Sequence, residues 1–274
     1  MSLPRIALQG IAGSFHHQAA LKLFPGGVQV VECRYFDQVP QAVTTGKADY
    51  GLMAIENSTA GSILPNYALI DASGLQILRE VYVDVRHQLM ALPGTRIDEI
   101  RRVWSHPMAL LQCGRFLRRH PAWERIEYED TAAAARDIAL GRLAGTAAIA
   151  PQIAAGRYGL EILAADIQDQ NTNATRFVLL GPPAPPQAGA DKVSLRIETP
   201  HRPGALLEIL EILAHYRWNM TKLQSLPIPQ QPWEYRFFID AVFPEAGSFD
   251  PVIDLLRQKS SHLKILGIYP NQNL

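Results

Sequence analysis

Four polar segments of this sequence each follow an apolar run and carry groups that could hold a small anion. They are GIAGSFHHQAA at residues 10–20, IENSTAGSI at 55–63, SHPMAL at 105–110 and NATRFVLL at 173–180. Hydroxyls, side-chain amides and the free N–H groups of a helix start bind carboxylate or phosphate without any net positive charge. A single serine in such a place is usually only a helix cap. The second segment would make a poor core and a poor helix, and it therefore favours a ligand-binding loop.

These segments must be positioned by alternating strands and helices. Strands are expected at or near residues 6–8, 28–31, 50–56, 81–92 and 146–150. Helices are expected to begin with Ser14, Asp37, Ser105 and Thr131 as caps. Two such series predict parallel α/β sheets in two lobes, with the chain returning at 168–180. Ligands in open α/β folds bind at the carboxyl ends of strands, so the predicted site lies in the cleft between the lobes.

A proline-rich segment, GPPAPPQAGAD at residues 181–191, separates two parts of the chain. Its prolines exclude a helix or a central strand. The residues after it are expected to form strand, helix, strand, strand, helix and strand, at 192–198, 204–215, 220–226, 235–242, 251–260 and 263–269. This is the ferredoxin-like βαββαβ order, a common α+β scaffold that does not indicate a function by itself.

The composition argues against several classes of function. Among 274 residues, 26 Lys and Arg balance 26 Asp and Glu, so neither nucleic acid nor a membrane surface is an expected partner. The two cysteines, Cys33 and Cys113, are too few for a disulfide framework or a CxxC metal site. GIAGS is neither a GxGxxG motif nor a P-loop, so no nucleotide cofactor is expected. The start has no signal-like segment and no apolar run reaches about 18 residues, which predicts a cytoplasmic protein.

The four polar segments, in this order, resemble the motifs of the prephenate dehydratase family. They stand here as Gly10 to Phe15, Ile55 to Ser62, Ser105 to Leu110 and Asn173 to Phe177. The segment RPGALLEIL at 202–210 resembles the G-A-L signature of the ACT regulatory domain attached to that family. No chorismate mutase helix bundle precedes the first motif, so the monofunctional form is expected.

The resemblance implies a fold and a domain division. The catalytic domain, at residues 4–181, is expected to have two α/β lobes of periplasmic-binding-protein type. Lobe 1 would span about 4–77 and 168–181, and lobe 2 about 78–167. A linker at 182–191 would lead to an α+β ferredoxin-like ACT domain at 192–272.

The reaction that the resemblance implies is conversion of prephenate to phenylpyruvate, with loss of CO₂ and water and with no metal or cofactor. Aromatisation drives it, so the site needs a donor for the departing hydroxyl rather than a strong base. The family motif marks Thr175 as the catalytic residue, and a positioned hydroxyl is a good donor to developing hydroxide. Neighbours in a strand point to opposite faces. Thr175 is therefore expected to face the substrate with Phe177 lining the ring pocket, while Arg176 braces the two lobes by ion pairs.

Donors for the two substrate carboxylates are expected around the cleft. The predicted substrate-binding residues are Ser14, Asn57, Ser58, Thr59, Ser62, His87, Arg176 and Phe177. His87 matches a family position, although a core histidine is an equally good interpretation. Glu56 is left open between a structural and a catalytic role, and His16 is expected to add a titratable group at the rim. Ala60 stands where the family usually has Glu, which removes a negative charge beside a dianion.

The resemblance also implies regulation by L-phenylalanine bound between paired ACT domains. The expected effector-binding residues are Gly204, Ala205 and Leu206 in one loop, and Gln224 and Ser225 in a second. In that second loop Gln224 replaces a family anion and Leu226 a family cation, which predicts altered affinity or weaker inhibition. Pairing would also cover open sheet edges, so a homodimer or homotetramer is expected.

Two other functions remain open from the sequence. One is an arogenate dehydratase, whose substrate carries an amino acid side chain in place of the pyruvoyl group. The other is a non-catalytic two-lobed sensor of an amino acid or another solute. The run Thr175-Arg176-Phe177 argues against a sensor without catalytic residues.

Overall fold

The chain folds into two units, and neither is contiguous in sequence. The computed structural model describes residues 2–228, 231, 233–244 and 249–272. The first unit contains the chain up to Ser62 together with Val81–Phe177, and the second contains Ile63–Glu80 together with the chain from Val178 onward. The predicted domain bounds follow chain order instead, and they stay a prediction.

The first lobe is built around one sheet. Its strands are β1 (Arg5–Gln9), β2 (Gln29–Cys33), β3 (Tyr50–Asn57), β4 (Gly61–Ser62), β5 (Gln76–Asp84) and β11 (Ala174–Gly181). Their order is β2-β1-β3-β11-β5, with β4 on β3, and β1 runs parallel to both β2 and β3. The helices are α1 (Phe15–Leu23) and α2 (Gln38–Thr44). The apolar runs of β1 and β3 are fully buried, as parallel strands covered on both faces require.

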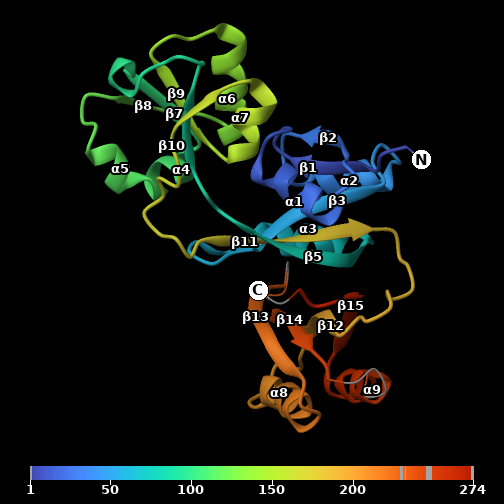
Figure 1. Ribbon diagram of the computed structural model, residues 1–274. Coiled ribbons are helices and arrows are strands. Elements are labelled where there is room, and N and C mark those ends of the chain that lie inside the picture. Colours follow the sequence, from blue (N-terminus) through green and yellow to red (C-terminus); the bar gives the residue numbers. More distant parts are fainter. Residues whose placement is uncertain (1, 229–230, 232, 245–248, 273–274) are drawn as a thin grey trace. The chain divides into compact units, whose positions relative to one another are not determined.

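The second lobe carries a sheet of its own (Figure 1). Its strands are β6 (Gln88–Ala91), β7 (Arg102–Ser105), β8 (Glu124–Glu127), β9 (Thr146–Ala150) and β10 (Glu161–Ala164), in the order β10-β6-β9-β7-β8. Its helices are η1 (Ile97–Glu99), α4 (Pro107–Gln112), α5 (Gly114–Arg118), α6 (Thr131–Gly141) and α7 (Gln152–Tyr158). The expected sheet was parallel, but β6 runs antiparallel to β9 and β10, so the sheet is mixed. The two-lobed architecture itself is confirmed.

The helix caps show where the sequence was misleading. Ser14 caps α1 as predicted, because its Oγ accepts a hydrogen bond from His17 N at 3.3 Å. Ser105 is not a cap, since its hydroxyl donates to Ile149 O at 2.6 Å across the sheet, and His106 caps α4 instead. Asp130, rather than Thr131, caps α6 with a carboxylate oxygen.

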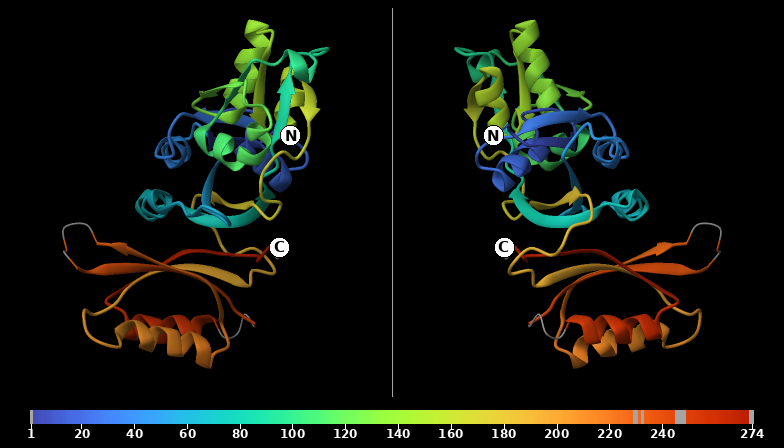
Figure 2. Two further views of the ribbon diagram at one scale, coloured as in Figure 1. Left: turned by 90° about the vertical axis from the view of Figure 1, so that its left-hand side faces the viewer. Right: turned by 90° about the vertical axis from the view of Figure 1, so that its right-hand side faces the viewer.

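The second unit contains the predicted βαββαβ order. Its strands are β12 (Lys192–Glu198), β13 (Asn219–Pro227), β14 (Tyr235–Val242) and β15 (His262–Tyr269), arranged as β13-β14-β12-β15. Helices α8 (Ala205–His215) and α9 (Phe249–Lys259) both lie on one face of this sheet (Figure 2). Between the helices and the sheet lies an apolar core that includes Leu195, Ile209, Ile239 and Val252.

The other face of this sheet is covered by residues 63–80, which form α3 (Leu64–Ser73) and the start of β5. The rings of Tyr67 on α3 and Phe238 on β14 lie 5.3 Å apart. Glu80 and Lys192 are almost completely buried and form an ion pair with N–O distances of 2.9 and 3.0 Å. A Cβ atom at Gly267 would lie 2.1 Å from Ile77 O, so only glycine allows the two backbones to approach so closely. No pattern in the sequence indicated this packing.

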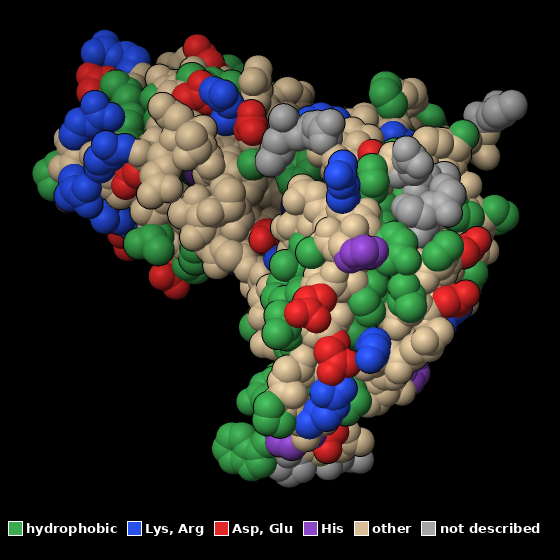
Figure 3. Space-filling model, turned by 90° about the horizontal axis from the view of Figure 1, so that it is seen from below, with side chains coloured by type: hydrophobic (Ala, Val, Ile, Leu, Met, Phe, Trp, Pro, Cys, Tyr) green, Lys and Arg blue, Asp and Glu red, His purple; other side chains and the backbone are tan. Residues whose placement is uncertain are grey.

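Acidic and basic side chains are interspersed over the face of the molecule drawn in Figure 3, in keeping with the net charge of zero. Within the described ranges, no helix is both long enough and apolar enough to cross a membrane.

Candidate active site

Asn57, at the end of β3, lies beside Thr175 at the start of β11. Its Nδ2 group donates to Thr175 Oγ1 at 3.0 Å and to Asn173 Oδ1 at 2.7 Å, with Ala174 O at 3.3 Å. Thr175 is 9% exposed. Because its hydroxyl oxygen accepts a hydrogen bond from Asn57, the hydroxyl hydrogen is turned away from Asn57. The arrangement prepares Thr175 as a hydrogen-bond donor.

The loop at residues 57–62 is held in place by its own side chains. Asn57 Oδ1 accepts hydrogen bonds from Thr59 N at 3.0 Å and Ala60 N at 2.8 Å. Ser58 Oγ accepts from Ala174 N at 2.9 Å and donates to Thr172 O at 3.0 Å. The amide of Asn57 and the hydroxyl of Ser58 are thus engaged within the protein. The structure therefore gives them positioning contacts, where the sequence suggested carboxylate donors.

His87 lies in the segment between β5 and β6 and is 2% exposed. Its backbone N donates to Gln168 Oε1 and its Nε2 contacts Gln112 Oε1, both at 2.9 Å. Burial lowers the pKa of His87, while the hydrogen bond to Gln112 opposes that shift. The ring is neutral near pH 7, and with Nε2–H donating to Gln112, Nδ1 is left as an acceptor. No partner for Nδ1 lies among the residues that the structure describes.

A pocket of about 310 Å³ joins these two groups. Gln112, the partner of His87, lines it, and so does Asn173, the partner of Asn57. The remaining lining residues are Thr59, Ala60, Met108, Leu111, Gln168, Asp169 and Gln170. Four of the lining residues carry side-chain amides, and Ala60, Met108 and Leu111 are apolar, a combination that suits a small ring compound with polar substituents. The residues that line the pocket include no Lys or Arg, so a bound anion would be held by neutral donors.

Of the predicted catalytic and substrate-binding residues, Thr59 lines this pocket, whereas the others do not: Thr175, Ser14, Asn57, Ser58, Ser62, His87, Arg176 and Phe177. The hydroxyl of Ser14 is 2% exposed and serves as the cap of α1. Ser62 lies on β4, opposite Glu56 of β3. The start of α1, which Ser14 caps, lies close to His87, because the ring of Phe15 is 5.5 Å from the ring of His87.

Phe177 and His16 differ from their expected places, and the bracing role expected of Arg176 stays a prediction. Arg176 is 4% exposed and lies 4.0 Å from Glu56 on neighbouring β3, so this ion pair does not join the two lobes. Phe177 is 1% exposed and packs in the core, 4.9 Å from the ring of His16. His16 also contacts Phe36, and burial lowers its pKa to about 4. His16 is therefore a partly buried ring that stays neutral near pH 7, where the sequence suggested a titratable group at the rim.

A second cavity, of about 370 Å³, lies in the second unit at the start of α8. It includes the predicted Gly204, Ala205 and Leu206, and its other lining residues are Thr199, Pro200, His201, Arg202, Leu207, Glu234, Tyr235 and Phe237. Gly204 has φ +78°, in the left-handed region that favours glycine. We call this space the C-terminal cavity.

Gln224 and Ser225 do not line the C-terminal cavity of their own chain. Both lie on β13, where Gln224 is opposite Phe238 of β14. Directly opposed residues of an antiparallel pair share a face. Gln224 is therefore on the face covered by α3, and its expected role in a site between paired domains stays a prediction.

The family model described as prephenate dehydratase matches residues 6–185. The chain belongs to the prephenate dehydratase family. Arogenate dehydratase/prephenate dehydratase 2 of Arabidopsis thaliana is 37% identical over 97% of this chain and 72% of its own. A solved prephenate dehydratase from Arthrobacter aurescens in complex with L-Phe has a TM-score of 0.83 and 29% identity, over 97% of this chain and 90% of that one. A structure named as GqqA, a novel type of quorum quenching acylases, has a TM-score of 0.88 and 32% identity over 98% of both chains.

The sequence reasoning missed the amides that build the pocket. Gln112 is the last residue of α4, the helix that begins inside the third prephenate dehydratase motif, and Asn173 begins the fourth motif. Gln168 and Gln170 lie in DIQDQNTN at 166–173, where most of the side chains are amides or carboxylates and a buried strand follows at once. That concentration of polar side chains before β11 was the available signal.

Proposed function

We propose that this chain catalyses the decarboxylating dehydration of prephenate to phenylpyruvate. The observation that carries the proposal is the hydrogen bond from Asn57 Nδ2 to Thr175 Oγ1 at 3.0 Å. It fixes a neutral hydroxyl with its proton free to donate, which is the one group that this reaction requires. Membership of the prephenate dehydratase family supplies the substrate class.

The reaction redistributes one electron pair through the ring. The bond between the ring carbon and its carboxylate breaks, CO₂ leaves, and the electrons complete the aromatic system while the C–O bond of the ring hydroxyl breaks. Prephenate dianion gives phenylpyruvate anion, CO₂ and hydroxide, which is released as water after protonation. Thr175 donates a hydrogen bond to the oxygen as its negative charge develops.

Two carboxylates must be bound in a pocket without a lining Lys or Arg. The side-chain amides of Gln112, Gln168 and Gln170 line the pocket and supply the neutral donors in this proposal. Neutral donors neutralise the ring carboxylate less than a cation would, and the carboxylate that is lost as CO₂ must give up its charge. Weak stabilisation of that ground-state charge favours the decarboxylation step.

We further propose that the second unit contains an ACT regulatory domain that binds L-phenylalanine in the C-terminal cavity. The Arthrobacter aurescens relative was solved with L-Phe, and the cavity combines the start of α8 with Tyr235 and Phe237. Free N–H groups at the start of the helix suit a carboxylate. Strand β13 is at the edge of its sheet, so Gln224 and Ser225 would reach a cavity only from a paired chain. This geometry supports a homodimer or homotetramer.

The activity is tested by comparing kcat/KM for prephenate and arogenate on the purified protein, with product measured by absorbance in base for phenylpyruvate. Turnover of prephenate with the higher kcat/KM supports the proposal. A higher value for arogenate would reassign the substrate, as the name of the Arabidopsis relative allows. Binding of prephenate without turnover of either compound would instead support a sensor. The same assay series also measures hydrolysis of an acyl-amide substrate, because one similar structure is named as an acylase.

A further inference from the structure

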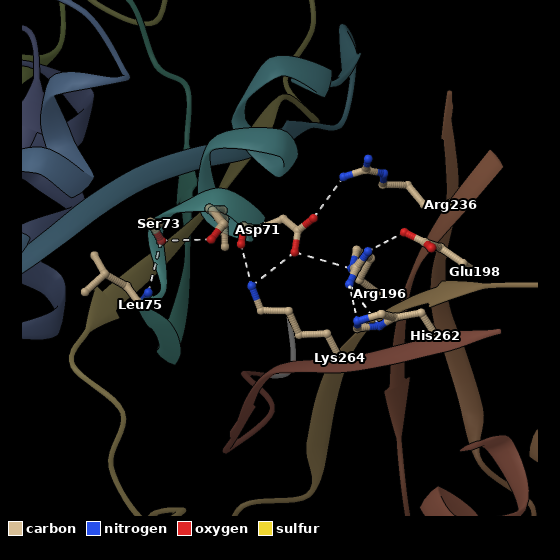
Figure 4. Close-up of polar contacts among 9 residues, drawn as sticks. Asp71, Ser73, Leu75, Arg196, Glu198, Arg236, His262 and Lys264 are labelled. Carbon is tan, nitrogen blue, oxygen red and sulfur yellow. Dashed lines mark hydrogen bonds and ion pairs between the residues drawn. The ribbon is translucent and has the colours of Figure 1, made fainter. Parts of the chain in front are cut away.

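The carboxylate of Asp71 on α3 forms ion pairs with three cationic side chains, which come from three strands of the C-terminal sheet (Figure 4). Asp71 Oδ2 lies 3.0 Å from Arg236 Nη1, and its Oδ1 lies 3.1 Å from Lys264 Nζ and 3.4 Å from Arg196 Nε. Its backbone oxygen also accepts a hydrogen bond from Lys264. The Asp71 side chain is only 10% exposed. We call these four residues the Asp71 cluster.

The Asp71 cluster fixes α3 to the sheet through charge and not only through apolar packing. Arg196 is on β12, Arg236 on β14 and Lys264 on β15. Arg196 also forms an ion pair with Glu198. Loss of the Asp71 carboxylate would leave the partly buried Arg236 and Lys264 without the anion that they share, which is costly in a low-dielectric setting. A change in the relative positions of these strands must therefore change the contacts of Asp71.

Strand β14 connects the Asp71 cluster to the C-terminal cavity. Tyr235 and Phe237 line that cavity, and Arg236 is the residue between them. Because successive side chains of a strand point to opposite faces, Arg236 projects away from the cavity and toward α3. The next residue on the α3 face, Phe238, contacts Tyr67 of the same helix. A ligand that displaces Tyr235 or Phe237 would thus act directly on Arg236 and Asp71.

The other end of α3 continues into the loop that positions Thr175. Only Ile63 stands between Ser62 and the first residue of α3, Leu64. The loop contains Asn57, which donates to Thr175, and it closes on β3 through the pairing of Asn57 with Gly61. A helix of ten residues transmits a shift of one end to the other, since its backbone hydrogen bonds resist bending.

We propose that the Asp71 cluster couples occupancy of the C-terminal cavity to the conformation of the loop at 57–62. An amino acid effector that binds better to one position of β14 changes the ion pair between Arg236 and Asp71. The resulting shift of α3 then displaces the loop that contains Asn57. Asp71 is a positioning residue here and touches neither ligand. The inference rests on the proposed effector site and the proposed dehydratase activity, and it identifies the element that links them.

The test uses Asp71→Asn and Arg236→Gln, with Asp254→Asn as the matched control. Asp254 lies on α9, is 65% exposed and forms an ion pair with Arg257 of the same helix. Three readouts are taken: L-Phe affinity by calorimetry, the effect of saturating L-Phe on kcat/KM for prephenate, and amide hydrogen exchange in residues 57–62. Arg236→Gln retains Asp71 with its other two cations, so it covers the case in which Asp71→Asn does not fold.

Coupling factors between sites are typically about 5–150-fold. We expect a factor in this range for the wild type and for Asp254→Asn, and less than about twofold for Asp71→Asn and Arg236→Gln, with L-Phe affinity within about threefold of wild type in all four. Faster exchange in residues 57–62 should accompany the loss. Inhibition of both cluster variants at the wild-type level would overturn the proposal.

Failure of the underlying proposals gives a different pattern. If the wild type does not bind L-Phe, the effector assignment is wrong, and if it does not turn over prephenate, the activity is wrong. In either case amide exchange without ligand still tests the link from the Asp71 cluster to the loop at 57–62, on which the coupling depends. Faster exchange of residues 57–62 in Asp71→Asn or Arg236→Gln than in Asp254→Asn supports it, and equal exchange rejects it.

Discussion

Replacing Asn57 by aspartate should abolish most of the activity while leaving the fold intact. The Oδ1 atom that holds Thr59 N and Ala60 N is retained, so the loop keeps its two backbone hydrogen bonds. The Nδ2 group, 3.0 Å from Thr175 Oγ1, becomes a carboxylate oxygen, and its hydrogen bonds to Asn173 Oδ1 and Ala174 O are lost as well. Thr175 then donates its proton to this new carboxylate, and hydrogen bonds to a charged group are about twice as strong as neutral ones. The hydroxyl is no longer free to donate to the leaving group.

The expected loss equals that of one transition-state donor, about 2.7–4 kcal/mol or 10²–10³ in kcat. Steady-state turnover of prephenate measures it, with thermal unfolding as the check on folding. Ser58→Ala is the matched control in the same loop, because it removes the contacts to Thr172 O and Ala174 N but leaves the Asn57–Thr175 bond. We expect kcat of Ser58→Ala to fall by less than about tenfold, which is well below the loss expected when a transition-state donor is removed. A folded Asn57→Asp enzyme with kcat close to that of the wild type would show that Asn57 does not keep the Thr175 hydroxyl free to donate.

Three further predictions concern stability and assembly. Because the pKa of His16 falls from 6.5 to about 4 on folding, its stabilisation is complete above pH 6.5 and is lost as the pH falls toward 4. The free energy of unfolding, measured with urea, should therefore fall less for His16→Leu than for the wild type between pH 7 and pH 4.5, by about 2–3 kcal/mol. An equal fall in the two proteins would contradict this prediction. Lys192→Met should destabilise by about 3–5 kcal/mol in the same assay, with partial recovery on adding Glu80→Gln, and a neutral single variant would count against the buried pair. Sedimentation at micromolar concentration should show a dimer or tetramer, and a monomer would speak against pairing through β13.

Much of the fold followed from local patterns in the sequence. The prolines at 182–191 marked the break between β11 and β12, and the apolar periodicity after them predicted β12 and β14 at the residues where they occur. Caps were less predictable, since a serine, threonine or aspartate at neighbouring positions competes for the same N–H groups. Asp130 was available one residue before Thr131, and its carboxylate forms two such bonds.

The site was predictable only in part, because motif membership does not say which way a side chain points. The motifs brought Asn57 and Thr175 to attention, and the structure joins them. They did not show that Asn57 serves Thr175 and the loop, or that Phe177 belongs to the core. The Asp71 cluster was beyond reach, since its four residues are spread over a separation of 193 positions and only tertiary packing brings them together.

The role of Thr175 as the catalytic donor is tested by measuring phenylpyruvate formation from prephenate by the wild type, Thr175→Ala and Thr175→Ser side by side. We predict that the wild type forms phenylpyruvate, that Thr175→Ala loses about 10²–10³ in kcat, and that Thr175→Ser, which keeps a hydroxyl, retains clearly more activity than Thr175→Ala. A folded Thr175→Ala enzyme with more than half of the wild-type kcat, or a folded wild type that forms no phenylpyruvate, would contradict it.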